Sequence, residues 1–552
     1  MFFSGVLFDL DNTLYSYKEC HDKALSKVLD TIANDYDIPI DILCNYYTNV
    51  SNTLKYELTS TASSHSKFIY FKHIVEHFRL NSKKITEYDN QYWDIFYKNM
   101  KCFDGVIDFF LWLKTNNIKI AIITDYETKY QIKKLEILGI LEMIDVIITS
   151  EEVGIEKPSK QMFLSCENKL QVSLDKCIMI GDNLEKDIYG AKNIGIISFL
   201  YTVEETSFFT FNCFKKLHTK FKDILNVLQN LETLSKYCGE RFDLTQAGGG
   251  NSSVKYNDFM FIKASGYNLT QVSHREGYVC IDNKKLINHI NENKTEPIHK
   301  YNIIGNERAS IETYMHSMLK KYTMHLHPIQ INKYLISKSC DAFIKTNFPN
   351  SKLIEYYTPG IKVCNKIKNV YDGNKIIFLK NHGIIVTSDD YEEIIELIEN
   401  TLTIFEKEFG TNMEKYKYVN KISKTINVRY ENVTYLCEDQ IINFYLQSKR
   451  NLFLEKIAFP DALIYCGIQI LFLYDLTDIN KYYEKYKEYP KIIVVNNLIY
   501  ITNRSLQKCK DTEDVLKSNL MILDNGMDKE YMSDQEIHYL NNWEAEKHRK
   551  YI

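Results

Sequence analysis

Short apolar runs alternate with longer stretches of helical periodicity over the first two hundred residues of this 552-residue chain. The apolar runs predict four buried strands, at 4–8, 119–124, 145–148 and 176–181. The stretch 15–100 has aromatic-rich helical periodicity and no strand alternation. Strands that alternate with helices predict a parallel, doubly wound sheet, which is an α/β fold. We therefore expect a Rossmann-like sheet with a helical insertion.

The pattern changes near residue 231, where strand-like and helix-like segments become mixed. Beyond 430 we expect further strands at 462–474 and 491–502, and a charged helix at 543–550. A chain of this length should hold two to four domains. We predict a first domain at 1–230, a second α/β domain at 231–430, and a smaller α/β extension of that domain at 431–552.

Composition and charge narrow the classes of function. An apolar share of 45% and a charged share of 25% are ordinary for globular proteins. The net charge of −4, with signs interspersed, gives no basic field for nucleic acid. Thirteen cysteines without a CxxC pair indicate reduced thiols. No apolar run approaches the roughly 20 residues of a membrane helix. We expect a cytoplasmic protein without nucleic-acid or membrane partners.

Acidic and hydroxyl side chains follow the predicted strands of the first domain, where doubly wound sheets place their active sites. Asp9 suits a nucleophile that attacks a phosphorus atom, and Asp11 can protonate the leaving oxygen and later deprotonate water. Thr124 and Lys157 can bind the transferred phosphoryl oxygens. Asp182 offers a hard oxygen for Mg²⁺, so we place the metal among Asp9, Asp11 (through a backbone carbonyl) and Asp182.

Four motifs carry these residues in one order along the chain. They are FDLDNTLY at 8–15, IITDYE at 122–127, GIEKPS at 154–159 and GDNLEKD at 181–187. In this order the first domain resembles the haloacid dehalogenase superfamily, and Asp11 places it in the phosphatase branch, because dehalogenase relatives lack this second aspartate. The resemblance implies a substrate-selecting helical cap at 15–100 and a supporting role for Asp187. Asp125 stands where the family more often has Asn or Gly.

A second group of polar residues lies in the second domain. His325 and His327 are two apart, so a strand would point both to one face. His382 can complete three imidazoles and leave an open position, as catalytic zinc requires. Glu312 is a plausible proton-transfer group. The donor-rich turns at 248–253 and 263–266 can bind a phosphate, with Lys263 adding charge.

These residues lie in the motifs GGGNSSVK, IKASG, SIET, HLHP, EYYTPG and NHG, which stand in the order found in class II (zinc) aldolases and their adducin-like relatives. The residues of these motifs most resemble those of rhamnulose- and fuculose-phosphate aldolases. The resemblance implies Zn²⁺ that stabilises an enediolate, proton transfer by Glu312, and a homo-oligomer. It also implies a phosphate site made by Asn251, Ser265, Gly266, Ser310 and Lys263. Residue 311 is Ile where these aldolases often have a second serine.

We expect a bifunctional enzyme acting on sugar phosphates and aldehydes. Its aldolase would join dihydroxyacetone phosphate to a short aldehyde, giving a ketose 1-phosphate, and its Mg²⁺-dependent phosphatase would hydrolyse sugar phosphates. Two alternatives stay open. One is a dehydratase plus phosphatase of a methionine-salvage-like pathway, and the other is a phosphatase fused to a non-catalytic sugar-phosphate binding module. Four further features favour structural roles: the HxxEH pattern from His73 to His77, His316, the pair Tyr356–Tyr357, expected in the core, and the helix at 543–550.

Overall fold

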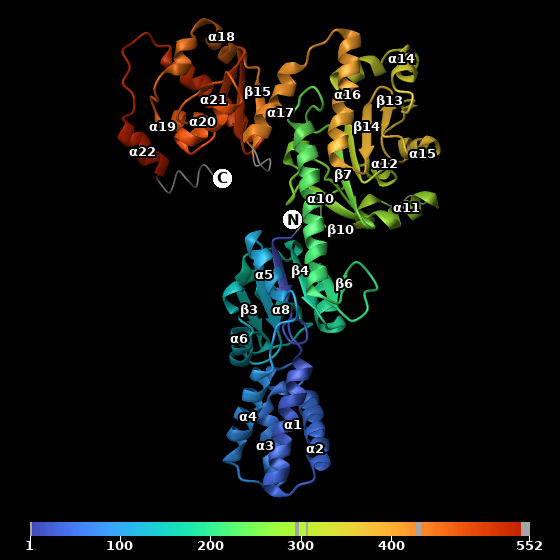
Figure 1. Ribbon diagram of the computed structural model, residues 1–552, viewed down its shortest axis with the longest axis vertical. Coiled ribbons are helices and arrows are strands. Elements are labelled where there is room, and N and C mark those ends of the chain that lie inside the picture. The colour runs from blue at the N-terminus through green and yellow to red at the C-terminus, as the bar shows by residue number, and fades with distance from the viewer. Residues whose placement is uncertain (1–2, 293–296, 305–306, 427–431, 543–552) are drawn as a thin grey trace. The chain divides into compact units, whose positions relative to one another are not determined.

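A computed structural model describes residues 3–292, 297–304, 307–426 and 432–542 (Figure 1). The chain divides into two compact units, Met1–Leu225 and Asn226–Ile552. The charged helix expected at 543–550 lies outside the described residues.

The first unit contains a parallel six-stranded sheet with the order β3-β2-β1-β4-β5-β6. Phe8 of β1 pairs with Ile122 of β2 on one side and with Ile180 of β4 on the other. The chain builds the sheet outward from β1 in one direction to β3 and then in the other direction from β4 to β6. The carboxyl ends of β1 and β4 therefore form the crevice where such sheets bind ligands. The strands are β1 (Gly5–Phe8), β2 (Lys119–Thr124), β3 (Val146–Thr149), β4 (Cys177–Gly181), β5 (Ile197–Tyr201) and β6 (Thr210–Phe211).

Helices cover the sheet and connect its strands. Apolar side chains form the core beneath them, and Phe8, Phe109 and Phe110 are fully buried. The ring centroids of Phe8 and Phe110 lie 4.7 Å apart, so β1 packs directly on α5 (Val106–Thr115), the helix that contains Phe110. Besides α5, these helices include α6 (Thr128–Ile137), α7 (Ser150–Val153), α8 (Lys160–Leu170) and α9 (Gly190–Lys192).

Four helices inserted between β1 and α5 form the cap, which is the helical insertion expected at 15–100. The Ser16 hydroxyl accepts a hydrogen bond from the Glu19 backbone N–H at 3.3 Å and so caps the first of them. Buried residues at a spacing of four, from Cys20 to Ile32, face the other cap helices. Figure 1 shows these helices side by side. They are α1 (Tyr17–Tyr36), α2 (Ile40–Glu57), α3 (Lys67–His77) and α4 (Lys84–Lys98).

The second unit begins within α10 (Phe214–Gly239) and contains an eight-stranded sheet with the order β10-β9-β8-β7-β11-β14-β13-β12. Its neighbouring strands are antiparallel except for β12 and β13, which are parallel. The central strands are β7 (Asn251–Tyr256), β11 (Tyr322–Leu326) and β14 (Gly383–Ser388). The outer strands are β8 (Phe259–Lys263), β9 (Tyr278–Asp282), β10 (Asn302–Ile304), β12 (Lys352–Ile354) and β13 (Ile376–Leu379).

Helices flank this sheet and fill one core cluster with its strands. They include α11 (Asn283–Asn291), α12 (Thr313–Ser317), α13 (Ile329–Leu335), α14 (Cys340–Asn347), α15 (Ile361–Val370) and α16 (Tyr391–Phe409). The mixed strand and helix expected at 231–430 is therefore present, and the α/β fold class is confirmed for both units.

A third, four-stranded sheet lies in the chain's last part, with the order β15-β18-β17-β16. The expected strand at 491–502 is a hairpin of β17 (Ile492–Val495) and β18 (Leu498–Asn503). The remaining strands are β15 (Val433–Cys437) and β16 (Leu471–Phe472), and the helices are α17 (Glu414–Ile426), α18 (Gln440–Ser448), α19 (Pro460–Cys466), α20 (Thr477–Tyr486), α21 (Leu506–Leu523) and α22 (Asp534–Asn542).

The expectation of a strand at 462–474 was wrong. The first part of this apolar run, residues 462–466, belongs to α19, which has Pro460 at its first position and ends where Gly467 adopts a φ of +83°. Proline fits the first helical position because its fixed φ suits a helix and its missing N–H would be unpaired there. Only Leu471 and Phe472 form a strand within the run.

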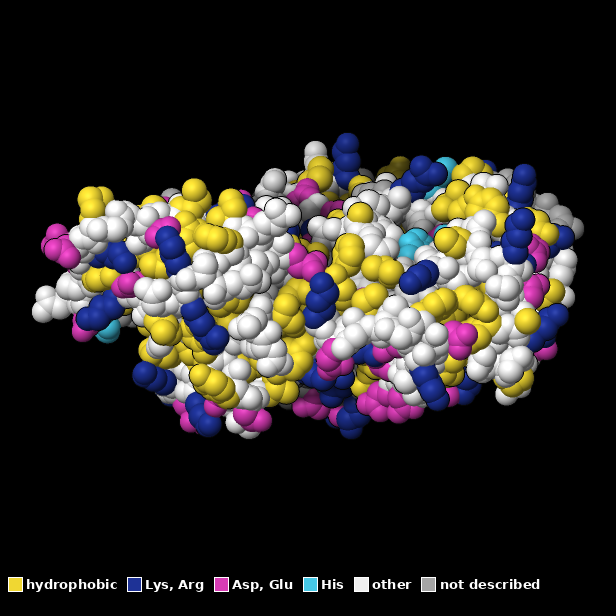
Figure 2. Space-filling view, turned by 90° about the horizontal axis from the view of Figure 1, so that it is seen from above, with side chains coloured by type: hydrophobic (Ala, Val, Ile, Leu, Met, Phe, Trp, Pro, Cys, Tyr) yellow, Lys and Arg dark blue, Asp and Glu magenta, His cyan; other side chains and the backbone are white. Residues whose placement is uncertain are grey.

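Two surface observations bear on the expected partners. Within the described residues, no helix combines the length and apolarity that crossing a membrane requires. Figure 2 shows that positive and negative side chains are interspersed over the face it presents, with hydrophobic side chains scattered between them.

Candidate functional sites

The first site is a buried ion-pair network at the carboxyl end of β1. Asp9 follows this strand and is 7% exposed. The Lys157 ammonium donates to Asp9 Oδ1 at 2.6 Å and to Asp187 Oδ1 at 2.7 Å. The Thr13 hydroxyl donates to Asp9 Oδ2 at 2.8 Å. One cation and one hydroxyl thus fix both oxygens of the aspartate that the sequence predicts as the nucleophile.

Burial and neighbouring charges shift the pKa values of Asp9 and Lys157 in opposite directions. Burial raises the pKa of Asp9 well above its usual value, and the Lys157 cation opposes that rise. Burial lowers the pKa of Lys157, but the Asp187 and Asp9 carboxylates outweigh it and raise this pKa, so the side chain stays an ammonium. Lys157 therefore stays charged and favours the ionised form of Asp9, against the effect of burial.

Three carboxylates at this edge can hold a divalent cation. One oxygen each from Asp9, Asp182 and Asp187 lies within 4.8 Å of the others. Burial, together with the Asp187 charge, raises the pKa of Asp182 to about 6, and the Lys157 cation only partly opposes this rise. Carboxylate oxygens are the ligands that Mg²⁺ prefers, so the group fits this ion. Asp187, expected only in support, stands in the cluster itself.

The Asp11 carboxylate points to different partners. The Lys134 ammonium donates to its two oxygens at 2.7 and 3.0 Å, and the Gln131 amide donates at 3.1 Å. The Tyr15 hydroxyl donates to it as well. Burial raises the pKa of Asp11, but Lys134 outweighs it and the net pKa is lowered. Asp11 is therefore held ionised, outside the carboxylate cluster formed around Asp9.

Thr124 and Asp125 stand at the end of β2. The Gln131 amide donates to the Thr124 hydroxyl oxygen at 2.5 Å. Asp125, where the family more often has Asn or Gly, accepts from the Lys157 backbone N–H at 3.0 Å and from the Lys186 ammonium at 2.8 Å. The unusual aspartate therefore anchors the loop that carries Lys157.

A cavity of about 360 Å³ joins these groups to the cap. Its walls include Asp9, Asp11, Thr124, Lys157 and Asp182, so the fold brings the expected phosphatase residues to one cavity. The sequence reasoning missed Lys134 and Gln131, which belong to no motif. Both lie on the buried face of α6 and are fully or almost fully buried. In the sequence they are only two polar residues within a predicted helix.

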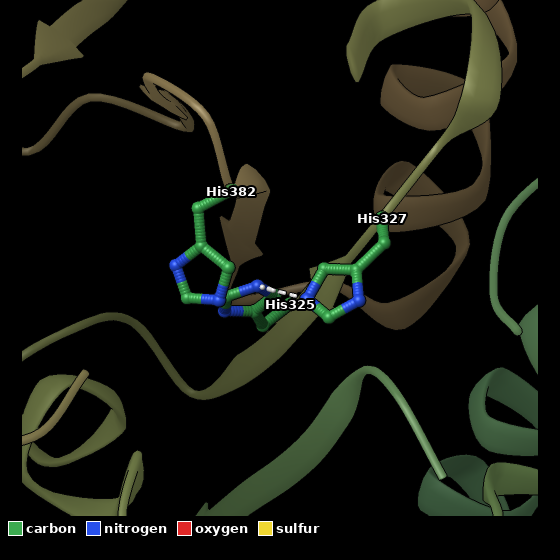
Figure 3. Close-up of side chains that lie close together, drawn as sticks. All are labelled: His325, His327 and His382. Atoms are coloured by element: carbon green, nitrogen blue, oxygen red, sulfur yellow. Dashed lines mark hydrogen bonds between the residues drawn. The ribbon is translucent and has the colours of Figure 1, made fainter. Parts of the chain in front are cut away.

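The second site is a cluster of three imidazoles in the eight-stranded sheet. His325 lies on β11, His327 just after it, and His382 just before β14 (Figure 3). Nε2 of His325 and Nε2 of His327 are 3.0 Å apart, and one nitrogen from each ring lies within 4.8 Å of the others. Burial lowers the pKa of all three, so they stay neutral and able to bind a metal. Zinc, with Zn–N bonds of about 2.0–2.1 Å, fits this set.

Two glycines allow these rings to meet. A Cβ on Gly383 would lie 2.2 Å from the Leu326 carbonyl oxygen and 3.0 Å from the ring of His327. A Cβ on Gly249 would lie 2.9 Å from Nδ1 of His327. Neither position has room for a larger side chain, so the GGG and NHG motifs serve the packing of the imidazole cluster.

Glu312 faces the same cluster. Its Oε1 lies 3.5 Å from Nδ1 of His325 and 3.7 Å from Nε2 of His382. The Asn251 amide donates to Glu312 Oε2 at 2.9 Å and to Ser310 Oγ at 2.5 Å. The expected acid–base group is thus within reach of the metal position, and its far oxygen is fixed by a buried amide.

Three of the expected phosphate-binding residues, Lys263, Ser265 and Gly266, lie at the end of β8 and in the turn that follows it. Lys263 ends β8, is buried, and donates to the Tyr267 carbonyl oxygen at 2.7 Å. Burial lowers its pKa, and the Glu312 charge partly opposes that shift. Ser265 and Gly266 form an exposed turn next to it, and Gly266 has a φ of +90°. Lys263 therefore braces the turn that could receive a phosphate.

The residues expected in structural roles have ordinary partners, with one correction. His316 is fully buried, and its Nδ1 lies 2.8 Å from the Ser253 hydroxyl. His77 stacks on Tyr46, with ring centroids 4.0 Å apart. Tyr356, expected in the core, is 57% exposed. It follows the short edge strand β12, where a tyrosine can project into solvent.

Comparisons with known proteins match both parts of the chain. The haloacid dehalogenase-like hydrolase model matches residues 3–195, and the Class II Aldolase and Adducin N-terminal domain model matches 232–407. Ribulose-1,5-bisphosphate 5-phosphatase from Halopiger xanaduensis is 32% identical over 210 residues, which are 37% of this chain and 87% of that protein. Glyceraldehyde 3-phosphate phosphatase from Methanocaldococcus jannaschii is 29% identical over 196 residues, 35% of this chain and 82% of that protein.

One solved structure is similar to the second part of the chain. The structure described as the N-terminal class II aldolase domain of a conserved protein from Thermoplasma acidophilum is 24% identical. The match covers 33% of this chain and 93% of that chain, with a TM-score of 0.31.

Proposed function

The chain belongs to the haloacid dehalogenase-like hydrolases and carries a class II aldolase and adducin domain after the hydrolase part, and from this membership we propose a bifunctional enzyme. Its first site would hydrolyse sugar phosphates, and its second would join dihydroxyacetone phosphate and a short aldehyde into a ketose 1-phosphate. The observation that carries the proposal is the presence of two complete sets of reactive side chains, one around Asp9 and one around His325.

At the first site, Asp9 attacks the phosphorus atom of the monoester and forms an acyl phosphate, while the ester oxygen leaves. Asp11 supplies the proton to that oxygen, then takes a proton from the water that hydrolyses the acyl phosphate, so Asp9 is regenerated and inorganic phosphate is released. Lys157 and Thr124 bind the phosphoryl oxygens. Mg²⁺ held by Asp9, Asp182 and Asp187 would supply positive charge against the phosphate.

Lys134 sets the resting state of Asp11. As arranged here, its ammonium donates to both Asp11 oxygens and favours the ionised form. This form is the base that the second step needs. A phosphate dianion near Asp11 would raise its proton affinity, which is what the first step needs. Lys134 therefore acts on the reaction through Asp11 and is a positioning residue.

At the second site, Glu312 takes a proton from the carbon next to the donor's carbonyl, and that carbon then forms a bond to the aldehyde carbon. The new alkoxide oxygen takes up a proton, so the overall reaction is an addition without loss of atoms. Zinc held by His325, His327 and His382 would stabilise the negative charge that develops on the donor's oxygens. The positions of Glu312 Oε1, 3.5 Å from His325 and 3.7 Å from His382, support this role.

The names of the relatives support a sugar-phosphate substrate for the first site, since both are phosphatases of such compounds. A shared chain also has a chemical rationale. Aldol addition is readily reversible, whereas hydrolysis of a phosphate ester is strongly downhill. If the phosphatase hydrolyses the aldol product and spares the donor, it pulls the addition towards the free sugar. The cap is where that choice could be made.

One incubation tests the proposal. The protein is mixed with dihydroxyacetone phosphate and a panel of short aldehydes, with and without EDTA, and the products are separated by mass. We expect a new C–C product and released phosphate, both lost with EDTA. A dehydration product would favour the methionine-salvage-like alternative. Phosphate release without new carbon products would favour a non-catalytic binding module in the second unit.

We also propose that the enzyme is a homo-oligomer, because the class II aldolases that its second part resembles are typically tetramers with sites at subunit contacts. Light scattering of the purified, active protein tests this. A mass several times the 65.1 kDa of one chain is expected, and a fully active monomer would contradict it.

A further inference from the structure

Five lysines line the phosphatase cavity, and three of them are paired with acids. The paired lysines lie near the catalytic end, and each donates to a carboxylate at 2.6–3.0 Å. The pairs are Lys134 with Asp11, Lys157 with Asp9, and Lys186 with Asp125. Asp9, Asp11 and Asp125 are thus each matched by a cation from the protein itself.

The other two lysines, Lys55 and Lys67, come from the cap. Lys67 is the first residue of α3, is 6% exposed, and donates to the His65 backbone carbonyl at 3.0 Å. Lys55 is near the end of α2 and is exposed. In the part of the chain that the structure describes, no carboxylate oxygen lies within 4.0 Å of either ammonium nitrogen. We call these two residues the cap lysines.

An ammonium buried without an anion is costly, so side chains of this kind are rare unless they have a partner or a use. Burial lowers the pKa of Lys67 to about 7, and the charges of Lys55 and Lys134 add to the effect. Aromatic rings give some compensation, since the ammonium lies 4.9 Å from the ring centroid of Tyr70. An anion in the cavity would supply the missing charge and restore the full cation.

The cap lysines line the same cavity as the reacting groups but come from the cap helices α2 and α3. The ring of Tyr17 is shared by two cations, with Lys67 6.0 Å and Lys134 5.2 Å from its centroid. Lys134 in turn donates to Asp11. The ring of Tyr17 therefore lies beside Lys67 and also beside the cation that pairs with Asp11.

We infer that the cap end of the cavity is a second anion site, at which Lys67 and Lys55 bind one phosphate of a sugar bisphosphate while the other phosphate reacts at Asp9. The inference rests on the proposed phosphatase function and names its substrate class. Two ammonium groups suit a phosphate dianion, because each can donate a charge-assisted hydrogen bond to a different oxygen. A monophosphate would leave the cap lysines without this partner.

The test compares phosphate release from a ketopentose 1,5-bisphosphate with release from the two corresponding monophosphates. For the unsubstituted protein we expect kcat/KM to be about ten- to a hundredfold higher for the bisphosphate, the range set by a hydrogen bond to a charged group. Lys67→Met should remove most of this preference through a higher KM for the bisphosphate. Its values for the monophosphates should change little.

Lys55→Met provides a second variant on an exposed residue, so its folding is not at risk, and it should reduce the same preference. Lys72→Met is the matched control, because Lys72 lies on α3 and pairs with Glu76. It should leave the preference unchanged. The inference is overturned if monophosphates are hydrolysed as well as the bisphosphate, or if both cap-lysine variants keep the original preference. No phosphate release from any of these substrates would instead contradict the proposed phosphatase itself.

Discussion

Asn251 holds Glu312 by a hydrogen bond of 2.9 Å from its amide nitrogen to Oε2, inside a buried cluster next to the three imidazoles. The same amide donates to the Ser310 hydroxyl oxygen. From the sequence we expected Asn251 to bind phosphate. In the structure its amide instead donates to Glu312, the expected acid–base group, and to Ser310. Both Asn251 and Glu312 are buried, so the bond is shielded from water and fixes which oxygen of Glu312 faces the metal position.

Replacing Asn251 with Ala should therefore slow the aldol reaction and leave the imidazole cluster intact. We expect kcat to fall about ten- to a hundredfold, as for other residues that orient a reacting group, while zinc content stays equal to that of the unsubstituted protein. Progress curves and metal analysis measure the two quantities. Loss of zinc in proportion to activity, or unchanged kcat, would contradict the positioning role.

Lys157 compensates two buried carboxylates, so its loss should affect both stability and phosphatase activity. Lys157→Met leaves Asp9 and Asp187 without their shared cation, and breaking such a buried pair costs about 3–5 kcal/mol. Phosphate release should fall about 10²- to 10³-fold because a donor to the phosphoryl oxygens is lost.

Thermal unfolding with and without Mg²⁺ checks the electrostatic reason for that loss. The variant should unfold at a lower temperature, and Mg²⁺ should raise its Tm more than that of the unsubstituted protein, because the ion replaces part of the missing charge. Lys169→Met is a suitable control, since this exposed lysine pairs with Glu152 on the surface. Equal Mg²⁺ effects on Lys157→Met and the unsubstituted protein would argue against the proposed metal cluster.

Glu240 should make the stability of the second unit depend on pH. It is buried and accepts hydrogen bonds from the Ser423 hydroxyl at 3.0 Å and the Thr434 backbone N–H at 3.2 Å. Burial raises its pKa from 4.5 to about 8. The folded state then keeps a proton that the unfolded state loses, so the free energy of unfolding falls as pH rises from about 4.5 to 8, by on the order of a few kcal/mol.

Urea denaturation at pH 5.5 and pH 8 measures this effect. Glu240→Gln, which cannot ionise, should have a smaller difference between the two pH values than the unsubstituted protein. A difference that the substitution leaves unchanged would assign the pH dependence to other groups.

The sequence predicted the fold well where local pattern and motif agree. The strand at 119–124 was correct to the residue, and the cap appeared within its expected limits. The run 462–474 failed because apolar residues without clear periodicity fit a buried helix as well as a strand, and Pro460 was the overlooked start signal. Contacts that depend on tertiary structure could not be predicted at all. Lys134 and Lys67 reach the cavity from different helices, and no spacing in the sequence relates them to Asp9.

Paired substitutions test whether one chain holds two independent catalytic sites. Phosphate release and C–C bond formation are measured in parallel for Asp9→Asn and His325→Ala, with folding of each variant checked by circular dichroism. Asp9→Asn should abolish phosphate release and keep the aldol reaction, because the two residues lie in separate units of the chain. His325→Ala should empty the zinc site, stop the aldol reaction and keep phosphate release. If either substitution silenced both reactions in a folded protein, the two-site account would be contradicted.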